Sequence, residues 1–257
     1  MKIDRVKAKN EFMDYVENYD SSNEKIKLKI DHTLRVCELC EDIAKSLNMS
    51  EDEIDIAWFT GLLHDIGRFE QVRRYGTFND ALSINHGKLG VEILFEEGRI
   101  RNFIEDNSID DLIKKVIGCH NAYEVPENFL DIEKTFSNIL RDADKIDIFK
   151  VNVVSPIEEV YNVSKEEVYN SEITKEVLEN FKREKTVLRS LRKSAVDNVV
   201  CHISLVFGLV YDESLKIVDE QGCLYELMKF KSNSLKVNEQ LKEAKNVVEE
   251  YIRRKLD

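Results

Sequence analysis

The sequence predicts an all-α protein, a helical bundle with additional helices at its C-terminal end. Among the 257 residues only 9 are Gly and 2 are Pro, too few for a protein of short strands and turns. Apolar residues recur at steps of three and four along most of the chain, which is the helical period. They make up 42% of the residues, enough for a packed core, so wholesale disorder is excluded.

The first predicted helix covers residues 28–47 and has His32 on its apolar stripe, so this imidazole should face inward. Ser50 and Glu53 have the spacing of a capping box and begin the second predicted helix. We expect Gly67 to end that helix as a left-handed cap, which would place His64 and Asp65 in its last turn.

The helical period breaks over residues 68–84, which mix Gly, charges and aromatics, and we expect a loop there, with room for a short helix. A further helix should begin near Ser83 and pass His86. Another should begin near Ser108 and end its apolar face at His120. A helix near residues 132–147 would carry Asp144.

The C-terminal part has a different character. Residues 151–171 look irregular, residues 194–211 form an apolar helix, and residues 235–257 form a long amphipathic helix. We expect one helical domain over residues 1–257, with a core at 24–150 and a C-terminal helical extension at 151–257. The last helix is also a candidate surface for a homodimer.

The charge balance limits the classes of partner. The net charge is −12, from 38 basic and 50 acidic residues, which argues against binding a long nucleic acid. A small anionic substrate remains compatible, because a bound metal ion can reverse the local field. Five Cys, no apolar leader and no stretch of 18 apolar residues predict a cytoplasmic protein with free thiols and no membrane segment.

The histidines that are predicted to face inward are the residues that indicate the chemistry of this protein. A buried imidazole needs a polar partner, and several of them near aspartates indicate a shared metal site. Imidazole and carboxylate ligands together suit Fe, Mn, Ni, Co or Zn, so we expect one or two divalent transition-metal ions. Asp142 and Asp147 are rivals to Asp144 for the last position. The candidate ligands are His32, His64, Asp65, His86, His120 and Asp144.

These residues resemble the HD-domain metal-dependent phosphohydrolase superfamily over residues 27–149. The resemblance rests on His32, on His64-Asp65 within Gly-Leu-Leu-His-Asp-Ile-Gly, and on Asp144 within Asp-Ala-Asp-Lys. It implies an all-helical fold in which these four residues hold a first metal. His86 and His120 match the extra histidines of the two-metal subgroup, in which Asp65 would bridge. The Gly-Tyr-Pro motif of the cyclic-di-GMP branch is absent here, so that substrate is not implied.

Such a site predicts hydrolysis of a small phosphorylated metabolite, with a nucleotide or phosphodiester as the leading class, by attack of a metal-activated hydroxide on phosphorus. We expect Asp65, Arg68 and Lys145 to be catalytic, because both cations lie within three residues after a ligand position and could stabilise phosphoryl charge. Arg35 and Arg73 are further candidates for substrate binding, along with Arg68 and Lys145. Any of these cations could instead be a solvated surface charge.

Two alternative functions remain open at this stage. Some two-metal members of this superfamily are mixed-valent di-iron oxygenases with a similar His/Asp ligand set, and a nucleotide-sensing regulatory module could use the metal for structure alone. The Cys37 and Cys40 pair lies within a predicted helix without a second such pair, so we interpret both as core residues.

Overall fold

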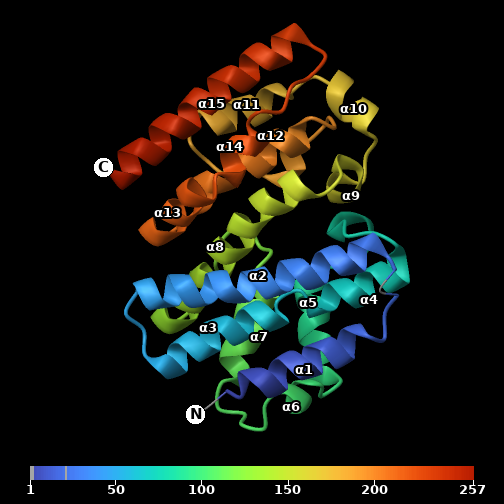
Figure 1. Cartoon of the computed structure of the whole chain (residues 1–257), viewed down its shortest axis with the longest axis vertical. Coiled ribbons are helices and arrows are strands. Elements are labelled where there is room, and N and C mark those ends of the chain that lie inside the picture. The colour runs from blue at the N-terminus through green and yellow to red at the C-terminus, as the bar shows by residue number, and fades with distance from the viewer. Residues whose placement is uncertain (1–2, 21) are drawn as a thin grey trace. The chain divides into compact units, whose positions relative to one another are not determined.

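The computed structural model describes residues 3–20 and 22–257, and throughout these ranges the regular elements are helices, with no strand (Figure 1). This confirms the all-α prediction. Within the same ranges, no helix combines the length and apolar character needed to cross a bilayer. The chain divides into two compact units, Met1–Asp144 and Lys145–Asp257. The division falls six residues before the boundary expected between core and extension, and the interpretation of both as one domain stays a prediction.

The first unit contains α1 to α7 and the start of α8. The expected helix at residues 28–47 is confirmed as the longer α2, and the backbone N–H of Ser50 donates to Glu53 Oε2 over 2.8 Å in the expected capping box. The bounds are α1 Arg5–Val16, α2 Glu24–Ser46, α3 Glu51–Leu63, α4 Ile66–Tyr75, α5 His86–Val91, α6 Ile100–Phe103, α7 Asp110–Cys119 and α8 Asp131–Val154, with a 3-10 turn at Asp80–Leu82 and a π-turn at Glu92–Glu96.

The prediction that Gly67 caps a helix is wrong. Helix α3 ends at Leu63, Asp65 has non-helical dihedrals of φ −103° and ψ 15°, and α4 begins directly after it, so Gly67 lies in the first turn of α4. Its absent side chain serves a helix crossing. A Cβ there would overlap the backbone carbonyl oxygen of His86 and lie 2.7 Å from the backbone nitrogen of Gly90. The glycine therefore lets α4 and α5 approach closely.

The loop expected at residues 68–84 is mostly helix. Residues 66–75 form α4, which ends at Gly76 with a left-handed φ of 65° while its N–H bonds to the carbonyl of Val72. The apolar period is masked because Arg68, Glu70 and Gln71 are buried polar residues of this helix. A true loop is left only between Gly76 and Asn85, interrupted by the 3-10 turn.

The second unit consists of the end of α8 and a set of short helices followed by one long helix. Residues 151–171 are more regular than expected, because α8 runs to Val154 and two short helices follow. The apolar helix expected at 194–211 is α12 followed by a 3-10 turn at Ser204–Gly208, and the long amphipathic helix is confirmed as α15. The bounds are α9 Ile157–Tyr161, α10 Lys165–Asn170, α11 Lys175–Lys182, α12 Asp197–Ile203, α13 Asp212–Gln221, α14 Cys223–Leu227 and α15 Leu235–Leu256, with a 3-10 turn at Arg189–Leu191.

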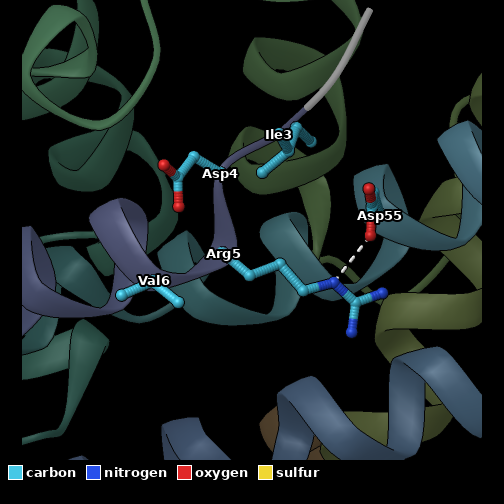
Figure 2. A pocket seen from close by; sticks show the side chains of 5 residues that line it. All are labelled: Ile3, Asp4, Arg5, Val6 and Asp55. Carbon is cyan, nitrogen blue, oxygen red and sulfur yellow. Dashed lines mark hydrogen bonds and ion pairs between the residues drawn. The ribbon is translucent and has the colours of Figure 1, made fainter.

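A shallow hollow lies beside the start of α1, lined by residues 3–6 and by Asp55 of α3 (Figure 2). Arg5 joins three helices there, since its Nε lies 2.6 Å from Asp55 Oδ1 and its Nη1 lies 2.5 Å from Glu41 Oε2 of α2. The hollow contains none of the predicted site residues. We therefore assign it to the packing of α1 on α2 and α3.

Candidate metal centre

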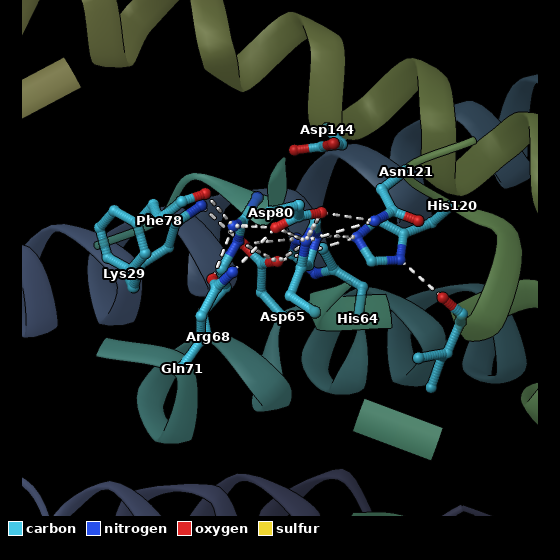
Figure 3. Close-up of polar contacts among 12 residues, drawn as sticks. Lys29, His64, Asp65, Arg68, Gln71, Phe78, Asp80, His120, Asn121 and Asp144 are labelled. Atoms are coloured by element: carbon cyan, nitrogen blue, oxygen red, sulfur yellow. Dashed lines mark hydrogen bonds and ion pairs between the residues drawn. The ribbon is translucent and has the colours of Figure 1, made fainter. Parts of the chain in front are cut away.

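Asp65 lies between two pairs of histidines, His32 with His64 and His86 with His120. Figure 3 labels Asp65 together with His64 and His120, one member of each pair. The buried carboxylate of Asp65 projects from the junction of α3 and α4. Oδ2 lies 3.5 Å from His32 Nε2 and 3.4 Å from His64 Nε2. Oδ1 lies 3.4 Å from His86 Nε2 and 3.7 Å from His120 Nε2. One carboxylate thus offers a separate oxygen to each pair.

The spacing within each pair suits a shared ion. The Nε2 atoms of His32 and His64 are 3.3 Å apart, and those of His86 and His120 are 2.9 Å apart. Two nitrogens that each lie about 2.0–2.1 Å from one ion, at angles between tetrahedral and square, are separated by about 2.8–3.4 Å. Each pair together with Asp65 is therefore a group that could hold a metal ion.

The hydrogen bonds of the Nδ1 atoms determine which ring nitrogen is free to act as a metal ligand. His64 Nδ1 lies 2.7 Å from the Gly61 carbonyl, and His120 Nδ1 lies 2.7 Å from the Ile117 carbonyl. A carbonyl oxygen only accepts hydrogen bonds, so Nδ1 carries the proton and the neutral ring has its lone pair on Nε2. Lone pairs that face one another and a carboxylate need a cation between them, so this donor set fits a transition-metal ion.

Burial and neighbouring charges hold the groups in their ligand forms. Burial lowers the pKa of His64, and burial together with the Arg68 charge lowers the pKa of His86 to about 3. Burial by itself would raise the pKa of Asp65, but the positive charge of Lys29 opposes it and holds that pKa well below its usual value. At neutral pH these imidazoles are neutral and the carboxylate is ionised, as metal ligands must be.

Asp144 completes the cluster from α8. Its Oδ1 lies 3.2 Å from His32 Nε2, and about a fifth of its side chain remains exposed, against 3% for Asp65. Burial would raise the pKa of Asp144, but the hydrogen bond and charge of His32 lower it below its usual range. The structure thus brings all six predicted ligands together, from α2, the α3–α4 junction, α5, the end of α7 and α8.

Arg68 lies beside this cluster in a buried position on α4. Its Nη1 donates to Gln71 Oε1 at 2.8 Å, to the carbonyl of Phe78 at 2.6 Å and to Asp80 Oδ1 at 2.9 Å. Its Nε lies 3.5 Å from Asp65 Oδ1 and is buried without a hydrogen-bond partner. The guanidinium is therefore held firmly on one side and has an unsatisfied donor beside the shared carboxylate.

Sequence reasoning missed three residues of this centre. Lys29 Nζ lies 2.6 Å from Asp65 Oδ2, and its position one turn before His32 on the same helix face could have revealed it. Asp80 accepts from His86 Nδ1 at 2.7 Å, and Asn121 donates to Asp80 at 2.9 Å. Asn121 directly follows a ligand, whereas Asp80 carries no local signal.

The remaining predicted cations lie in other surroundings. Arg73 and Arg74 both pair with Glu70, at 2.6 Å and 2.5 Å, and are largely exposed. Arg35 is half-buried on α2, one turn after His32. Lys145 donates to the Gly208 carbonyl within the second unit. Their roles in substrate binding stay predictions.

Comparison with known proteins identifies the family of this chain. The family model described as HD domain matches residues 30–203, more than half of the chain and all six clustered ligands. The chain belongs to the HD-domain family. Searches of curated proteins and of solved structures found no match. Metal-dependent phosphohydrolases make up most of the HD-domain family, and the two groups that share Asp65 are where this HD domain could hold metal.

Proposed function

We propose that this HD-domain chain is a two-metal phosphohydrolase that acts on a small phosphorylated metabolite, with nucleotides as the leading class. One observation carries the proposal. Asp65 lies between two histidine pairs, and the unpartnered Nε–H of Arg68 is 3.5 Å from its Oδ1. A buried N–H without an acceptor costs free energy, and a phosphoryl oxygen is a strong acceptor of matching charge.

The six clustered side chains would hold the ions. His32, His64 and Asp144 would serve the first position, His86 and His120 the second, and Asp65 would bridge them. When bound, divalent ions supply Lewis acidity, lowering the pKa of a coordinated water toward about 7 and polarising a phosphoryl oxygen. The protein contributes neutral imidazoles and an ionised bridge, both set by the burial and charges described above.

Arg68 and Lys29 would bind and orient the phosphoryl group. Arg68 is fixed by three hydrogen bonds from Nη1, so little conformational entropy is lost when its free donor engages substrate. Lys29 is 14% exposed and places a second cation against the same carboxylate. With bound ions balancing the clustered carboxylates, these two cations would favour an anionic substrate.

Phe78 supports the choice of nucleotides. Its half-buried ring lies 5.5 Å from both Lys29 Nζ and Arg68 Cζ. An aromatic face beside two cations suits a ligand that combines a planar ring with a phosphate. A cytoplasmic location and a homodimer stay predictions from the sequence alone.

The test is phosphate release by the full-length chain loaded in turn with Mn²⁺, Fe²⁺, Co²⁺, Ni²⁺ and Zn²⁺. Nucleoside monophosphates and an aryl phosphodiester serve as substrates. We expect release with at least one ion, and loss of both metal and activity in Asp65→Ala. Asp111→Asn, which removes a carboxylate that is 93% exposed on α7, is the matched control and should keep both.

Full phosphatase activity in Asp65→Ala would contradict the proposal. So would the absence of phosphate release from every substrate by a chain that carries two ions. Oxygen consumption by the iron form, without phosphate release, would instead favour a di-iron oxygenase.

A further inference from the structure

Four side chains from three parts of the first unit converge on the carboxylate of Asp80, and Figure 3 labels three of them, Arg68, Gln71 and Asn121. Oδ1 accepts from Arg68 Nη1 and from Gln71 Nε2 of α4, each at 2.9 Å. Oδ2 lies 2.7 Å from His86 Nδ1 of α5 and accepts from Asn121 Nδ2 at 2.9 Å, and the same His86 Nδ1 lies 2.9 Å from Oδ1. The 3-10 turn that begins at Asp80 is thereby tied to the metal centre from several directions.

Asp80 also distinguishes His86 from two other histidines of the cluster. His64 and His120 each hold their Nδ1 against a backbone carbonyl, whereas His86 holds its Nδ1 against an ionised carboxylate. The hydrogen bond from His86 and the charge of Arg68 outweigh burial and keep the pKa of Asp80 below its usual value. A carboxylate partner fixes the tautomer of an imidazole ligand and makes its other nitrogen more basic.

We propose that Asp80 is a positioning residue that keeps the proton of His86 on Nδ1 and thereby sets the affinity of the second metal position. The inference rests on the two-metal form of the proposed function. It assigns a role to a residue that would touch neither ion nor substrate. The first position, served by His32 and His64, has no contact with Asp80 of this kind, so the effect of Asp80 should be confined to one ion.

The partners of Asp80 make a sharp test available. Arg68 can only donate, and the amide of Gln71 is fixed as a donor because its Nε2 also donates to the carbonyl of Ile84 at 2.9 Å. In Asp80→Asn the amide oxygen must therefore serve these two donors, and the new NH₂ group takes the place of Oδ2, the oxygen closer to His86 Nδ1. His86 Nδ1 then keeps only its 2.9 Å contact with an oxygen that two other donors already use, so its proton should shift toward Nε2, where it would occupy the metal-binding lone pair.

Two readouts on the full-length chain test this. The first is the tautomer of His86 in the chelator-treated protein, measured from ring ¹⁵N shifts and assigned by comparison with His86→Gln. We expect the Nδ1–H form in the wild type and a shift toward the Nε2–H form in Asp80→Asn. The second is calorimetric titration with Zn²⁺. The second ion should bind about 10–100-fold more weakly in Asp80→Asn, while the affinity for the first ion is unchanged.

A control variant separates positioning from general damage. Asp111→Asn controls for the loss of one negative charge. If Asp80→Asn weakened the binding of both ions equally, or left the tautomer of His86 unchanged, the inference would be overturned.

Failure of the proposed function would look different. A wild-type chain that takes up only one Zn²⁺ would refute the two-metal proposal, and the tautomer measurement would then decide the role of Asp80 by itself. If the wild-type chain binds two ions and Asp80→Asn binds both with unchanged affinity, only the proposed role of Asp80 is refuted.

Discussion

The ammonium nitrogen of Lys29 lies 2.6 Å from Oδ2 of Asp65, the oxygen that also faces His32 and His64. The Lys29 side chain is 14% exposed and that of Asp65 only 3%. Lys29 therefore supplies the countercharge of this buried carboxylate when no ion does, and it competes with a cation for the same oxygen.

Lys29→Met should accordingly have two opposite effects. The metal-free chain should lose about 3 kcal/mol of stability, because a buried carboxylate loses its charged partner. The first ion should bind several-fold more tightly, because a neighbouring positive charge has been removed. Chemical denaturation of the chelated protein and metal titration measure the two effects. Lys27→Met, an exposed position on the same helix, should change neither, and weaker metal binding in Lys29→Met would contradict the competition.

Metal content should follow the division of ligands between the two pairs. We expect about two transition-metal ions per wild-type chain, measured by elemental analysis after purification without chelator, and about one in His86→Gln. His202→Gln should keep two ions, because His202 lies in the second unit with its ring beside Tyr161. Two ions in His86→Gln would show that this imidazole is dispensable for the second position.

The crossing of α4 and α5 predicts opposite effects for two glycine substitutions. Gly67→Ala should cost about 1–3 kcal/mol and weaken the second metal position, because its Cβ would push against the backbone of His86. Gly118→Ala on α7 would meet only Val91 Cγ2, at 3.5 Å, and should stabilise the helix by up to about 1 kcal/mol. Thermal unfolding and zinc titration of both variants measure this. A Gly67→Ala chain as stable as wild type would contradict the close approach.

The ion pairs of Glu70 with Arg73 and Arg74 should make a pH-dependent contribution to the free energy of unfolding. Burial would raise the pKa of Glu70, but Arg73 and Arg74 outweigh burial and hold that pKa below 4.5. A carboxyl whose pKa is lower in the folded than in the unfolded state stabilises the fold above the unfolded pKa, and this is lost as pH falls through the folded value. Glu70→Gln should therefore cost about 1 kcal/mol at pH 7, a modest figure because both arginines are exposed.

Urea unfolding of wild type and Glu70→Gln at pH 7 and at successive values below pH 4.5 measures this contribution. The difference between the two proteins should shrink as the solution becomes more acidic. A difference that stays constant over that range would assign the loss to packing rather than to charge.

The sequence was sufficient to locate the cluster of six side chains, because histidines on otherwise apolar helix faces stand out from their surroundings. The sequence was less informative for residue types that can serve more than one structural purpose. Gly67 has the position of a helix cap, but only the packed structure reveals that α5 crosses there. Arg68 and Gln71 look like loop residues because the groups that satisfy them, Phe78 and Asp80, lie further along the chain.

The residues around the ligands were harder to predict than the ligands themselves. Lys29 and Asp80 are charged residues with no unusual local pattern, and what marks them is a partner 36 and 6 residues away in the sequence. Such pairings follow from helix packing rather than from helix period. The two compact units likewise divide within α8, at a point where the sequence pattern is uninterrupted.

The clustered ligands also have a kinetic consequence, because His32 and Asp144 are separated by about 110 residues of chain. An ion bound to both would act as a cross-link that closes nearly the whole first unit into one loop. An unfolded chain could hold those ends together only at a large entropic cost, so the bound ion and the fold would be lost together. The rate at which a chelator extracts the last metal would then report how often the helices of this unit open.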